Sequence, residues 1–575
     1  MGGIFIKQNT LIDYAAAIVV FSLLLWAGCS NLWGARIKHA YPEGYLASDA
    51  FQQQVRAEYI KDAGNYNHEP PYTSQGYEDV VGSYPPVMHI LGAALSMLSG
   101  LEVYDGAYLL VFLLACLSAI TTYLIIREFS RQVALLSIPL SALVFSKSIY
   151  LAFAWGHWSA LTALAFLLLF CWTIVRIRLK GMHIILAIAL IGLTLTHTSE
   201  MIFAVLFLVL WLAADLAIRY LHMAQAKHKA SHPSPISSYL SGLIRRLGIS
   251  AIIIIVASSY FLAMFYQVWM KAQPYQFGAM PTWPNNPAFY VADFGWLLGI
   301  IMVIGAIVSI VLLLSKATKP GKRAVIIIAW GMLLLGFTNY LGFRVRAFQL
   351  RFFWPYLLAP FLGIGLYIII KTLLRRVSII KAAVISALLL AMTLNIISIP
   401  AIGMPHYDKM TGSIMDQYHW DALVWMSKNT EEDAEIYFFY GDLYDQDAVL
   451  RNSKRNHVLL KPYDFVAAIQ NRTIKRTYDT EQPGQGFYYY KISTFKFGLH
   501  PNKPEGQMDI CSFGYLVFDT QPGREQSIPL IQYNLLLRQK LLEKTWIEEV
   551  FSNRVVSILK NSKPGDDCIE TQTFE

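Results

Sequence analysis

Apolar runs of about 20 residues recur along this 575-residue chain and constrain its fold more than any other feature. Each is long enough to cross a bilayer core of about 30 Å as a helix. The chain is only 15% charged, whereas soluble domains carry about 25% charged residues. The sequence therefore predicts a mostly α-helical, polytopic membrane protein. We expect eleven transmembrane helices, near residues 11–33, 104–126, 133–152, 155–175, 182–198, 200–218, 248–270, 294–315, 324–342, 352–370 and 379–399.

The distribution of Lys and Arg predicts how the chain is oriented in the cell membrane. With the N-terminus in the cytoplasm, the internal segments carry 19 of these residues and the external loops carry 8, as the positive-inside rule requires. The apolar run 87–100 is too short to cross, and counting it as a span would invert every later loop. We interpret 87–100 as a helix at the membrane interface, and the polar insert 219–246 as an internal, solvated loop.

Residues 401–575 differ from the membrane part and predict an extracytoplasmic α/β domain. They hold 19 Lys and Arg against 24 Asp and Glu, so the basic residues of the chain are mostly helix-flanking and give no indication of a nucleic-acid partner. Helical patterns at 420–428 and 532–543 alternate with strand patterns at 435–440, 514–518 and 554–559. We expect two domains, 1–400 and 401–575, with residues 34–103 forming the first outer loop. Whether Cys511 and Cys568 pair there, and whether Asn471 is glycosylated, stay open.

Asp49 follows the first predicted span and is our candidate catalytic acid or base. A carboxylate held against the membrane is costly unless it has a function. It precedes residues 51–60, which are typical of an amphipathic interfacial helix. The alternative is a plain N-cap, a position that Asp favours.

Three arginines on the predicted outer face, Arg344, Arg346 and Arg351, run against the positive-inside trend. Arginine suits bidentate phosphate binding, so a lipid phosphate at the membrane surface would account for the cluster. The alternative is that these side chains extend toward the lipid headgroups.

Further polar residues at the predicted outer turns are candidates for a functional site: Glu200, His197, His157 and Asp293. Polar groups at membrane depth are functional candidates by default. His197 could instead be a packing residue, and His157, between two tryptophans, could belong to an aromatic belt at the interface. The Cys and His spacing predicts no zinc site.

Four segments together resemble the GT-C superfamily of membrane glycosyltransferases, both in their order along the chain and in the side of the membrane on which we expect them. They are Ser48-Asp49-Ala50-Phe51, the segment from Tyr84-Pro85-Pro86 to Leu101, Arg351-Phe352-Phe353-Trp354-Pro355, and the helix from Trp420 to Thr430. The resemblance implies a GT-C fold, a polyprenyl-phosphate-linked sugar as donor, and a glycan, lipid or protein acceptor. It implies that Asp49 is the general base and that Arg351, with Arg346, neutralises the departing lipid phosphate.

The chain departs from asparagine-modifying oligosaccharyltransferases at two places. Their Trp-Trp-Asp motif is replaced by Phe438-Phe439-Tyr440-Gly441-Asp442, and the turn 153–156 lacks the paired acids that such enzymes use for a metal. The resemblance therefore favours a monosaccharide transferase, with an oligosaccharyltransferase as the alternative. No cofactor is certain, and a requirement for Mg or Mn stays open. A transporter or a scaffold for lipid-linked glycan assembly is the non-enzymatic alternative, although we find no internal repeat of the kind that transporters carry.

Overall fold

The computed structural model describes most of the membrane part and two portions of the C-terminal region. The described residues are 8–33, 36–66, 68–73, 80–81, 85–145, 152–177, 179–226, 236–265, 287–315, 317–336, 350–396, 414–439, 441, 443–444, 447–459, 473–475, 507–522 and 528–568.

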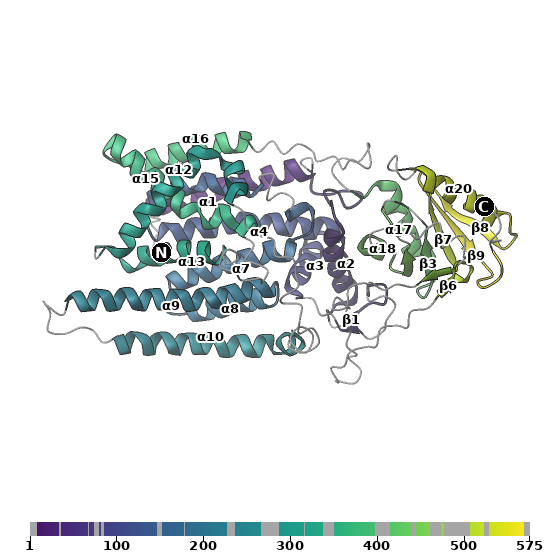
Figure 1. Cartoon of the computed structure of the whole chain (residues 1–575), viewed down its shortest axis with the longest axis horizontal. Helices are drawn as coiled ribbons and strands as arrows, with labels where there is room; N and C mark the ends of the chain where they lie inside the picture. Colours follow the sequence, from purple (N-terminus) through teal and green to yellow (C-terminus); the bar gives the residue numbers. More distant parts are fainter. Residues whose placement is uncertain are drawn as a thin grey trace, which may run out of the picture.

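Long apolar helices form a bundle that makes up more than half of the described molecule (Figure 1). They are α1 (Gln8–Trp33), α4 (Val103–Arg127), α5 (Arg131–Ser141) continued by η1 (Ala142–Phe145), α7 (Trp158–Val175), α8 (Met182–Thr194), α9 (Thr198–Ala226), α10 (Ile236–Phe265), α12 (Pro287–Leu314), α13 (Pro320–Gly336), α14 (Leu350–Leu357), α15 (Ala359–Leu374) and α16 (Ile379–Ile396). The prediction of a mostly helical, multi-pass membrane protein is confirmed.

Six helices among the described residues are long and apolar enough to cross a membrane, in α1, α4, α7, α9, α10 and α12. Four other predicted spans coincide with shorter apolar helices, in α5, α8, α15 and α16. Proline explains two of the interruptions, because its ring removes a backbone donor and clashes with the preceding turn. Pro139 lies in the last turn of α5, and Pro355 lies in α14 just before the chain restarts as α15.

The prediction that 219–246 is a solvated loop is wrong for much of its length. Helix α9 continues to Ala226 and α10 begins at Ile236. Arg219 lies inside this helical extension, where its Nε donates to Asp215 Oδ2 at 2.7 Å. Such i, i+4 pairs stabilise a polar helix that extends beyond the bilayer.

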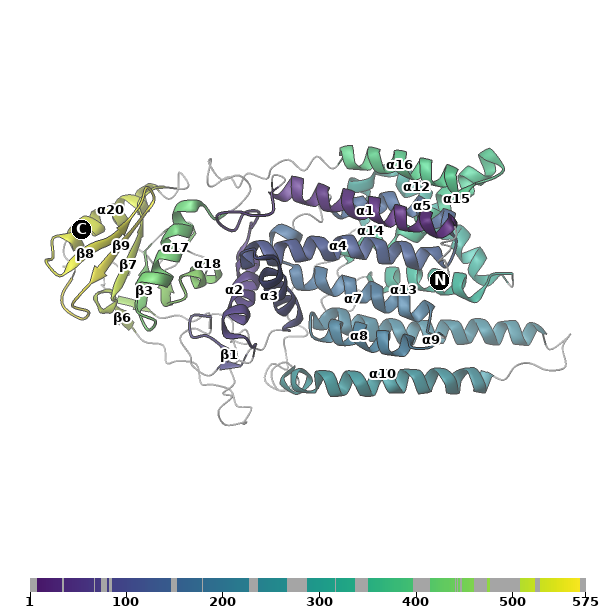
Figure 2. The same cartoon turned by 180° about the vertical axis from the view of Figure 1, so that it is seen from behind.

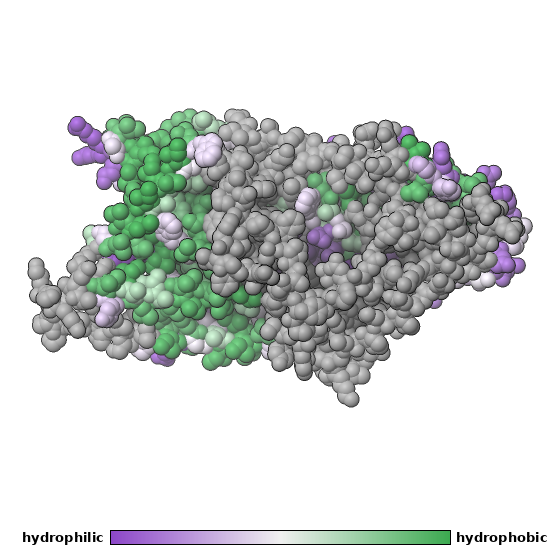
Figure 3. All heavy atoms as spheres, in the orientation of Figure 1, coloured by the Kyte–Doolittle hydropathy of each residue, from purple (hydrophilic) through white to green (hydrophobic). Residues whose placement is uncertain are grey.

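On the face of the bundle that Figure 3 shows, most of the coloured surface is apolar. Only 17% of the apolar window of α10 and 22% of that of α12 is buried inside the protein. Exposed large side chains on these helices include Ile252, Val256, Trp296 and Val311. An apolar surface of this extent is unfavourable in water, so these helices lie at the lipid-facing perimeter.

Two shorter helices, α2 (Ser48–Ala63) and α3 (Val87–Ser99), lie across one end of the bundle, between it and the C-terminal domain (Figures 1 and 2). Figure 2 shows the last turns of α9 and the first turns of α10 at the opposite end of the bundle. The 13 residues of α3 span about 20 Å, so α3 is too short to cross a bilayer. The length and the direction of α3 are therefore consistent with the prediction that residues 87–100 form a helix that does not cross the membrane.

The C-terminal region contains a five-stranded mixed sheet in the order β4-β3-β7-β9-β8. Its strands are β3 (Glu435–Phe438), β4 (Asn456–Leu459), β7 (Tyr515–Asp519), β8 (Ile547–Ser552) and β9 (Val556–Asn561), with helices α17 (Gln417–Asn429), α18 (Asp447–Leu450) and α20 (Ile528–Leu542). Strand β3 is parallel to β4 and β7, whereas β9 is antiparallel to β7 and β8. All five predicted elements are present, and β4 and β8 were not predicted.

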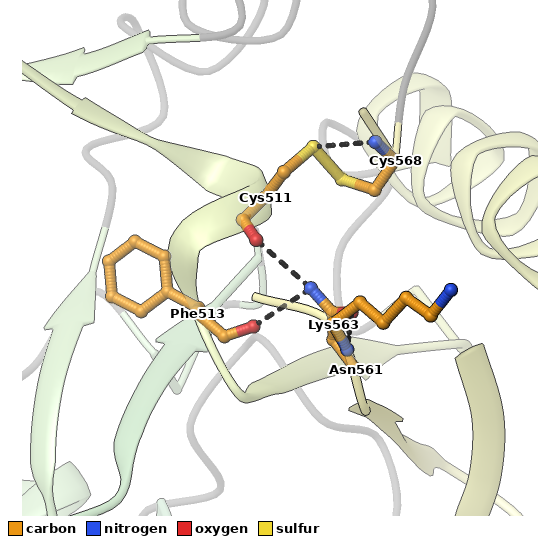
Figure 4. Close-up of a disulfide and its surroundings, with 5 residues drawn as sticks. All are labelled: Cys511, Phe513, Asn561, Lys563 and Cys568. Atoms are coloured by element: carbon orange, nitrogen blue, oxygen red, sulfur yellow. Dashed lines mark hydrogen bonds between the residues drawn. A yellow bond between two sulfur atoms is a disulfide. The ribbon is translucent and has the colours of Figure 1, made fainter. Parts of the chain in front are cut away.

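A disulfide between Cys511 and Cys568, left open by the sequence, closes the end of this domain (Figure 4). Asn561 Nδ2 donates to the carbonyls of Cys511 and Phe513, so the last strand is joined to the same turn. The disulfide and these hydrogen bonds together hold the end of the C-terminal region to the turn before β7.

A buried histidine joins helix α17 to the sheet. His419 lies between Asp416 Oδ2 at 2.7 Å and Asp519 Oδ2 at 3.2 Å. Burial alone would lower the pKa of His419, but the two carboxylates raise it to about 10. The imidazole is therefore charged at neutral pH and pairs the helix with the end of β7.

Candidate functional site

Asp49 lies in the first turn of α2, and its side chain is exposed. The N-cap of the helix is Ala47, which makes no side-chain capping hydrogen bond. The alternative that Asp49 is the N-cap is therefore wrong. A carboxylate in the first turn of a helix interacts favourably with the positive end of the helix dipole, and this position places Asp49 at the end of the bundle.

The turn before α7 holds the Asp49 peptide in place. Gly156 in this turn has φ +86°, and a Cβ added to it would lie 2.2 Å from Ala50 N and 2.5 Å from the carbonyl carbon of Asp49. No side chain fits at that distance, so only glycine permits this approach. Leu46 N also donates to Ala154 O at 2.8 Å. The structure thus brings the segment that carries His157 against the segment that carries Asp49.

Glu200 and His197 form a pair at the start of α9. The Glu200 side chain is fully buried, and His197 Nδ1 is hydrogen-bonded to Glu200 Oε2. Among the described residues, Glu200 Oε1 has no hydrogen-bond partner. An unsatisfied buried carboxylate oxygen is costly in a protein interior, so this atom is a candidate for binding a polar group of a ligand.

The loop before α9 also contacts the start of α3. Val87 N donates to Leu195 O at 2.9 Å. The Glu200 and Asp49 segments are therefore linked through α3 and α2, because these two helices pack together. No direct contact joins the two carboxylates among the described residues, so their convergence on one substrate stays a prediction.

A buried polar network between α2, α3 and α7 was not predicted from the sequence. His89 Nε2 lies 2.6 Å from Gln53 Oε1, and Ser159 Oγ donates to the same oxygen at 3.4 Å. Burial, reinforced by the positive charge of Arg56, lowers the pKa of His89 to about 3. The imidazole is therefore neutral. Since Gln53 lies one turn after Asp49, this network fixes the helix that carries the candidate base.

A second unpredicted cluster fastens the first outer loop to α4. Asp105 Oδ2 accepts a hydrogen bond from the backbone N of His39 at 2.9 Å, and Asp105 Oδ1 lies 2.7 Å from His39 Nδ1. Glu43 Oε2 lies 3.7 Å from the other ring nitrogen, and Tyr104 OH donates to His39 O. The sequence signal that could have identified them is a histidine within an apolar run for His89, and a histidine four residues before an acid, Glu43, for His39.

For four other predicted site residues, the structure describes no side chain. Arg344 and Arg346 lie outside the described residues. Arg351 is in the first turn of α14 and Asp293 is in α12, but the structure describes neither side chain. The predicted phosphate site therefore stays a prediction.

The residues present do not form a metal site within the described part of the chain. No three His, Cys, Asp or Glu side chains gather there as ligands, and the turn from Phe153 to Gly156 carries no acid. We derive no step that uses a metal ion.

Comparison with known proteins assigns the fold. No protein-family model matches the chain, and no curated protein matches its sequence significantly. The solved structures that resemble it include the oligosaccharyltransferase AglB from Archaeoglobus fulgidus, in complex with an inhibitory peptide and a dolichol-phosphate (13% identity, 79% of this chain, 65% of that chain, TM-score 0.50). The arabinofuranosyltransferase AftD from Mycobacteria also does (11% identity, 97% and 40% coverage, TM-score 0.51).

These structural neighbours are GT-C glycosyltransferases. The chain is thus a multi-pass membrane protein with a GT-C-like fold and a C-terminal mixed sheet, as the resemblance predicted. It spans less than two thirds of the length of either neighbour. At this identity the likeness concerns the fold, and the activity has to be argued from the residues.

Proposed function

We propose that this chain is an inverting glycosyltransferase that moves a sugar from a polyprenyl-phosphate carrier to an acceptor on the extracytoplasmic face of the membrane. The observation that carries the proposal is the placement of Asp49. An exposed carboxylate stands at the start of a helix that lies across the end of the bundle, and Gly156 fits against its backbone. The GT-C-like fold and the dolichol-phosphate bound to AglB support a lipid phosphate as part of the donor.

In the proposed reaction, Asp49 takes the proton from an acceptor hydroxyl as its oxygen attacks the anomeric carbon of the donor. The bond between that carbon and the phosphate oxygen breaks, and the polyprenyl phosphate leaves with the electron pair. A positioned general base contributes about 10²–10⁴-fold to such a step. One displacement at the anomeric carbon inverts its configuration.

The positively charged residues would stabilise the leaving group. Arg351, with Arg346 and Arg344, neutralises the charge that develops on the lipid phosphate. Glu200 and His197 hold the sugar or acceptor through the unpartnered Glu200 oxygen, while His157 and Asp293 complete the positioning set.

The arrangement of the helices supports the roles proposed for the two parts of the chain and the orientation proposed for it in the membrane. Helices α2 and α3 and the C-terminal domain lie at one end of the bundle, and the last turns of α9 and the first turns of α10 lie at the other (Figures 1 and 2). With the positive-inside orientation, the Asp49 end is extracytoplasmic. We assign residues 1–400 to catalysis and 401–575 to acceptor binding or to covering the site.

The likeness to AglB favours an oligosaccharyltransferase as the second candidate. Against it, Phe438-Phe439 stand where the resemblance would place a Trp-Trp-Asp motif. A peptide acceptor therefore belongs in the assay beside glycan and lipid acceptors.

The test is a transfer assay with the purified full-length chain and a panel of polyprenyl-phosphate sugars. We expect Asp49→Asn to lower turnover by at least about 100-fold, while the free energy of unfolding falls by no more than about 1 kcal/mol, the value of the lost interaction with the helix dipole. Asp421→Asn is the matched control, because Asp421 is an exposed acid on α17 that accepts only a local hydrogen bond from Gln417. Full activity of Asp49→Asn would refute its role, and a wild-type chain that transfers no sugar would favour the transporter or scaffold alternative.

A further inference from the structure

The C-terminal domain contacts the membrane part at the first outer loop and the start of α4. Ile414 N donates to Tyr45 O at 2.9 Å, and the ring of Trp420 meets that of Tyr104 edge to face with centroids 5.4 Å apart. A third contact is ionic and falls on α2 itself, the helix that carries Asp49. The domain is therefore seated on the element that presents the candidate base.

The ionic contact is a bridge from one lysine to two carboxylates. Lys454 Nζ lies 2.9 Å from Glu58 Oε1 and 2.7 Å from Asp62 Oδ2. Glu58 and Asp62 are one turn apart on α2, so both face the same side of the helix. Burial alone would lower the pKa of Lys454, but the two carboxylates raise it above its ordinary range, and the ammonium stays charged.

Lys454 is held in position by its own domain. Its backbone is in the left-handed region, with φ 53° and ψ 31°, a conformation that is unfavourable for a non-glycine residue. The next residue, Arg455, is buried and donates to the carbonyls of Ser427 and Thr430 at 3.0 and 2.8 Å. These bonds tie the Lys454 turn to the end of α17, so a movement of the domain moves the lysine with it.

Helix α2 can transmit that movement to Asp49. Its middle is fastened at Gln53 by His89, with Asp49 one turn before this point and Glu58 five residues after it. At 1.5 Å per residue, the two arms are about 6 Å and about 7.5 Å long. A displacement of the Glu58 end therefore acts on Asp49 through the same helix, against the contact that holds the Asp49 peptide beside Gly156.

We propose that Lys454 is a positioning residue, which couples the seating of the C-terminal domain to the placement of Asp49 through Glu58 and Asp62. This inference rests on the proposed function for its catalytic consequence. Its structural part, the dependence of α2 on Lys454, stands without it. The C-terminal domain then acts in the transfer step by fixing the base, in addition to binding an acceptor.

The experiment combines amide hydrogen exchange with transfer kinetics on the full-length chain. Lys454→Glu removes the bridge, Lys454→Arg preserves the charge, and the charge-swapped protein combines Lys454→Glu with Glu58→Lys and Asp62→Lys. Lys540→Glu is the control, because Lys540 pairs with Glu543 at the end of its own helix, at 3.3 Å, has no other ion pair among the described residues, and is 44% exposed.

We expect Lys454→Glu to speed exchange of the α2 amides by up to about fivefold, the upper range for the loss of a solvent-accessible ion pair, with exchange in β7 and β9 unchanged. Turnover falls while the Michaelis constant for the donor stays the same, and both Lys454→Arg and the charge swap restore turnover. Lys540→Glu changes neither quantity.

Two results would overturn the inference. One is unchanged exchange in α2 of Lys454→Glu. The other is faster exchange in α2 with turnover equal to that of the wild type, which would make the bridge merely structural. If the wild-type chain transfers no sugar at all, the proposed function fails, whereas the exchange data still decide whether Lys454 holds α2.

Discussion

Replacing Gly156 by Ala tests whether the backbone of Asp49 has to stay where the structure places it. The added Cβ would lie 2.2 Å from Ala50 N, whereas ordinary contact begins at 3.4 Å. The Asp49–Ala50 peptide, the 155–157 turn or both must therefore give way by about 1.2 Å. A misplacement of about 1 Å can cost a catalytic group about 100-fold in rate, so we expect a loss of that order in turnover.

The same substitution also costs stability, for two separable reasons. An alanine in the left-handed region costs about 1–2 kcal/mol, and the clash adds about 1–3 kcal/mol of overpacking. Gly181→Ala is the matched control, because Gly181 has φ +84° and nothing within 4 Å of an added Cβ. It carries the backbone cost without the clash.

The assay measures turnover and the thermal unfolding midpoint of both variants in the same detergent. We expect both midpoints to fall, with Gly156→Ala lower than Gly181→Ala, and only Gly156→Ala to lose turnover. Equal turnover in the two variants would refute the reasoning, because it would mean that the position of the Asp49 peptide does not matter for the reaction.

Three further predictions concern stability. Cys511→Ser removes a disulfide that spans 57 residues, so calorimetry should show the C-terminal domain of the variant less stable than that of the wild type by about 4 kcal/mol. A wild-type unfolding transition that reductant leaves unchanged would contradict this prediction. The pKa of His419 is raised to about 10 from 6.5, so its contribution is complete below pH 6.5 and is lost as pH rises through about 10, and His419→Gln should remove that slope. The pKa of His89 is lowered to about 3, so acidification from pH 6.5 toward pH 3 should destabilise the wild type but have less effect on His89→Gln.

Much of the architecture follows from local patterns in the sequence. Apolar runs predicted the bundle helices because burial in lipid depends on composition over about 20 residues. The two missed strands of the C-terminal sheet illustrate the limit. Strand β8, Ile547–Ser552, carries exposed acids on an edge of the sheet, so its pattern is weakly apolar, and only its pairing with β9 reveals it.

The candidate site was predicted less completely, because its key relations join distant residues. The position of Asp49 after the first span is visible in the sequence, but the need for glycine at 156 arises from a contact across more than 100 residues. The pairing of His89 with Gln53, and of Lys454 with α2, likewise depends on how helices pack. Charge and spacing identify such residues as unusual, and they do not say which partner each will meet.

The most direct measurement is an experimental structure of the full-length chain with a bound polyprenyl-phosphate sugar. The account predicts that the lipid phosphate lies against Arg351 and that the anomeric carbon faces Asp49, with room for an acceptor oxygen within about 3 Å of the carboxylate. A donor bound with its sugar away from the α2 end of the bundle, or with Asp49 out of reach of the acceptor position even through one water, would contradict the account.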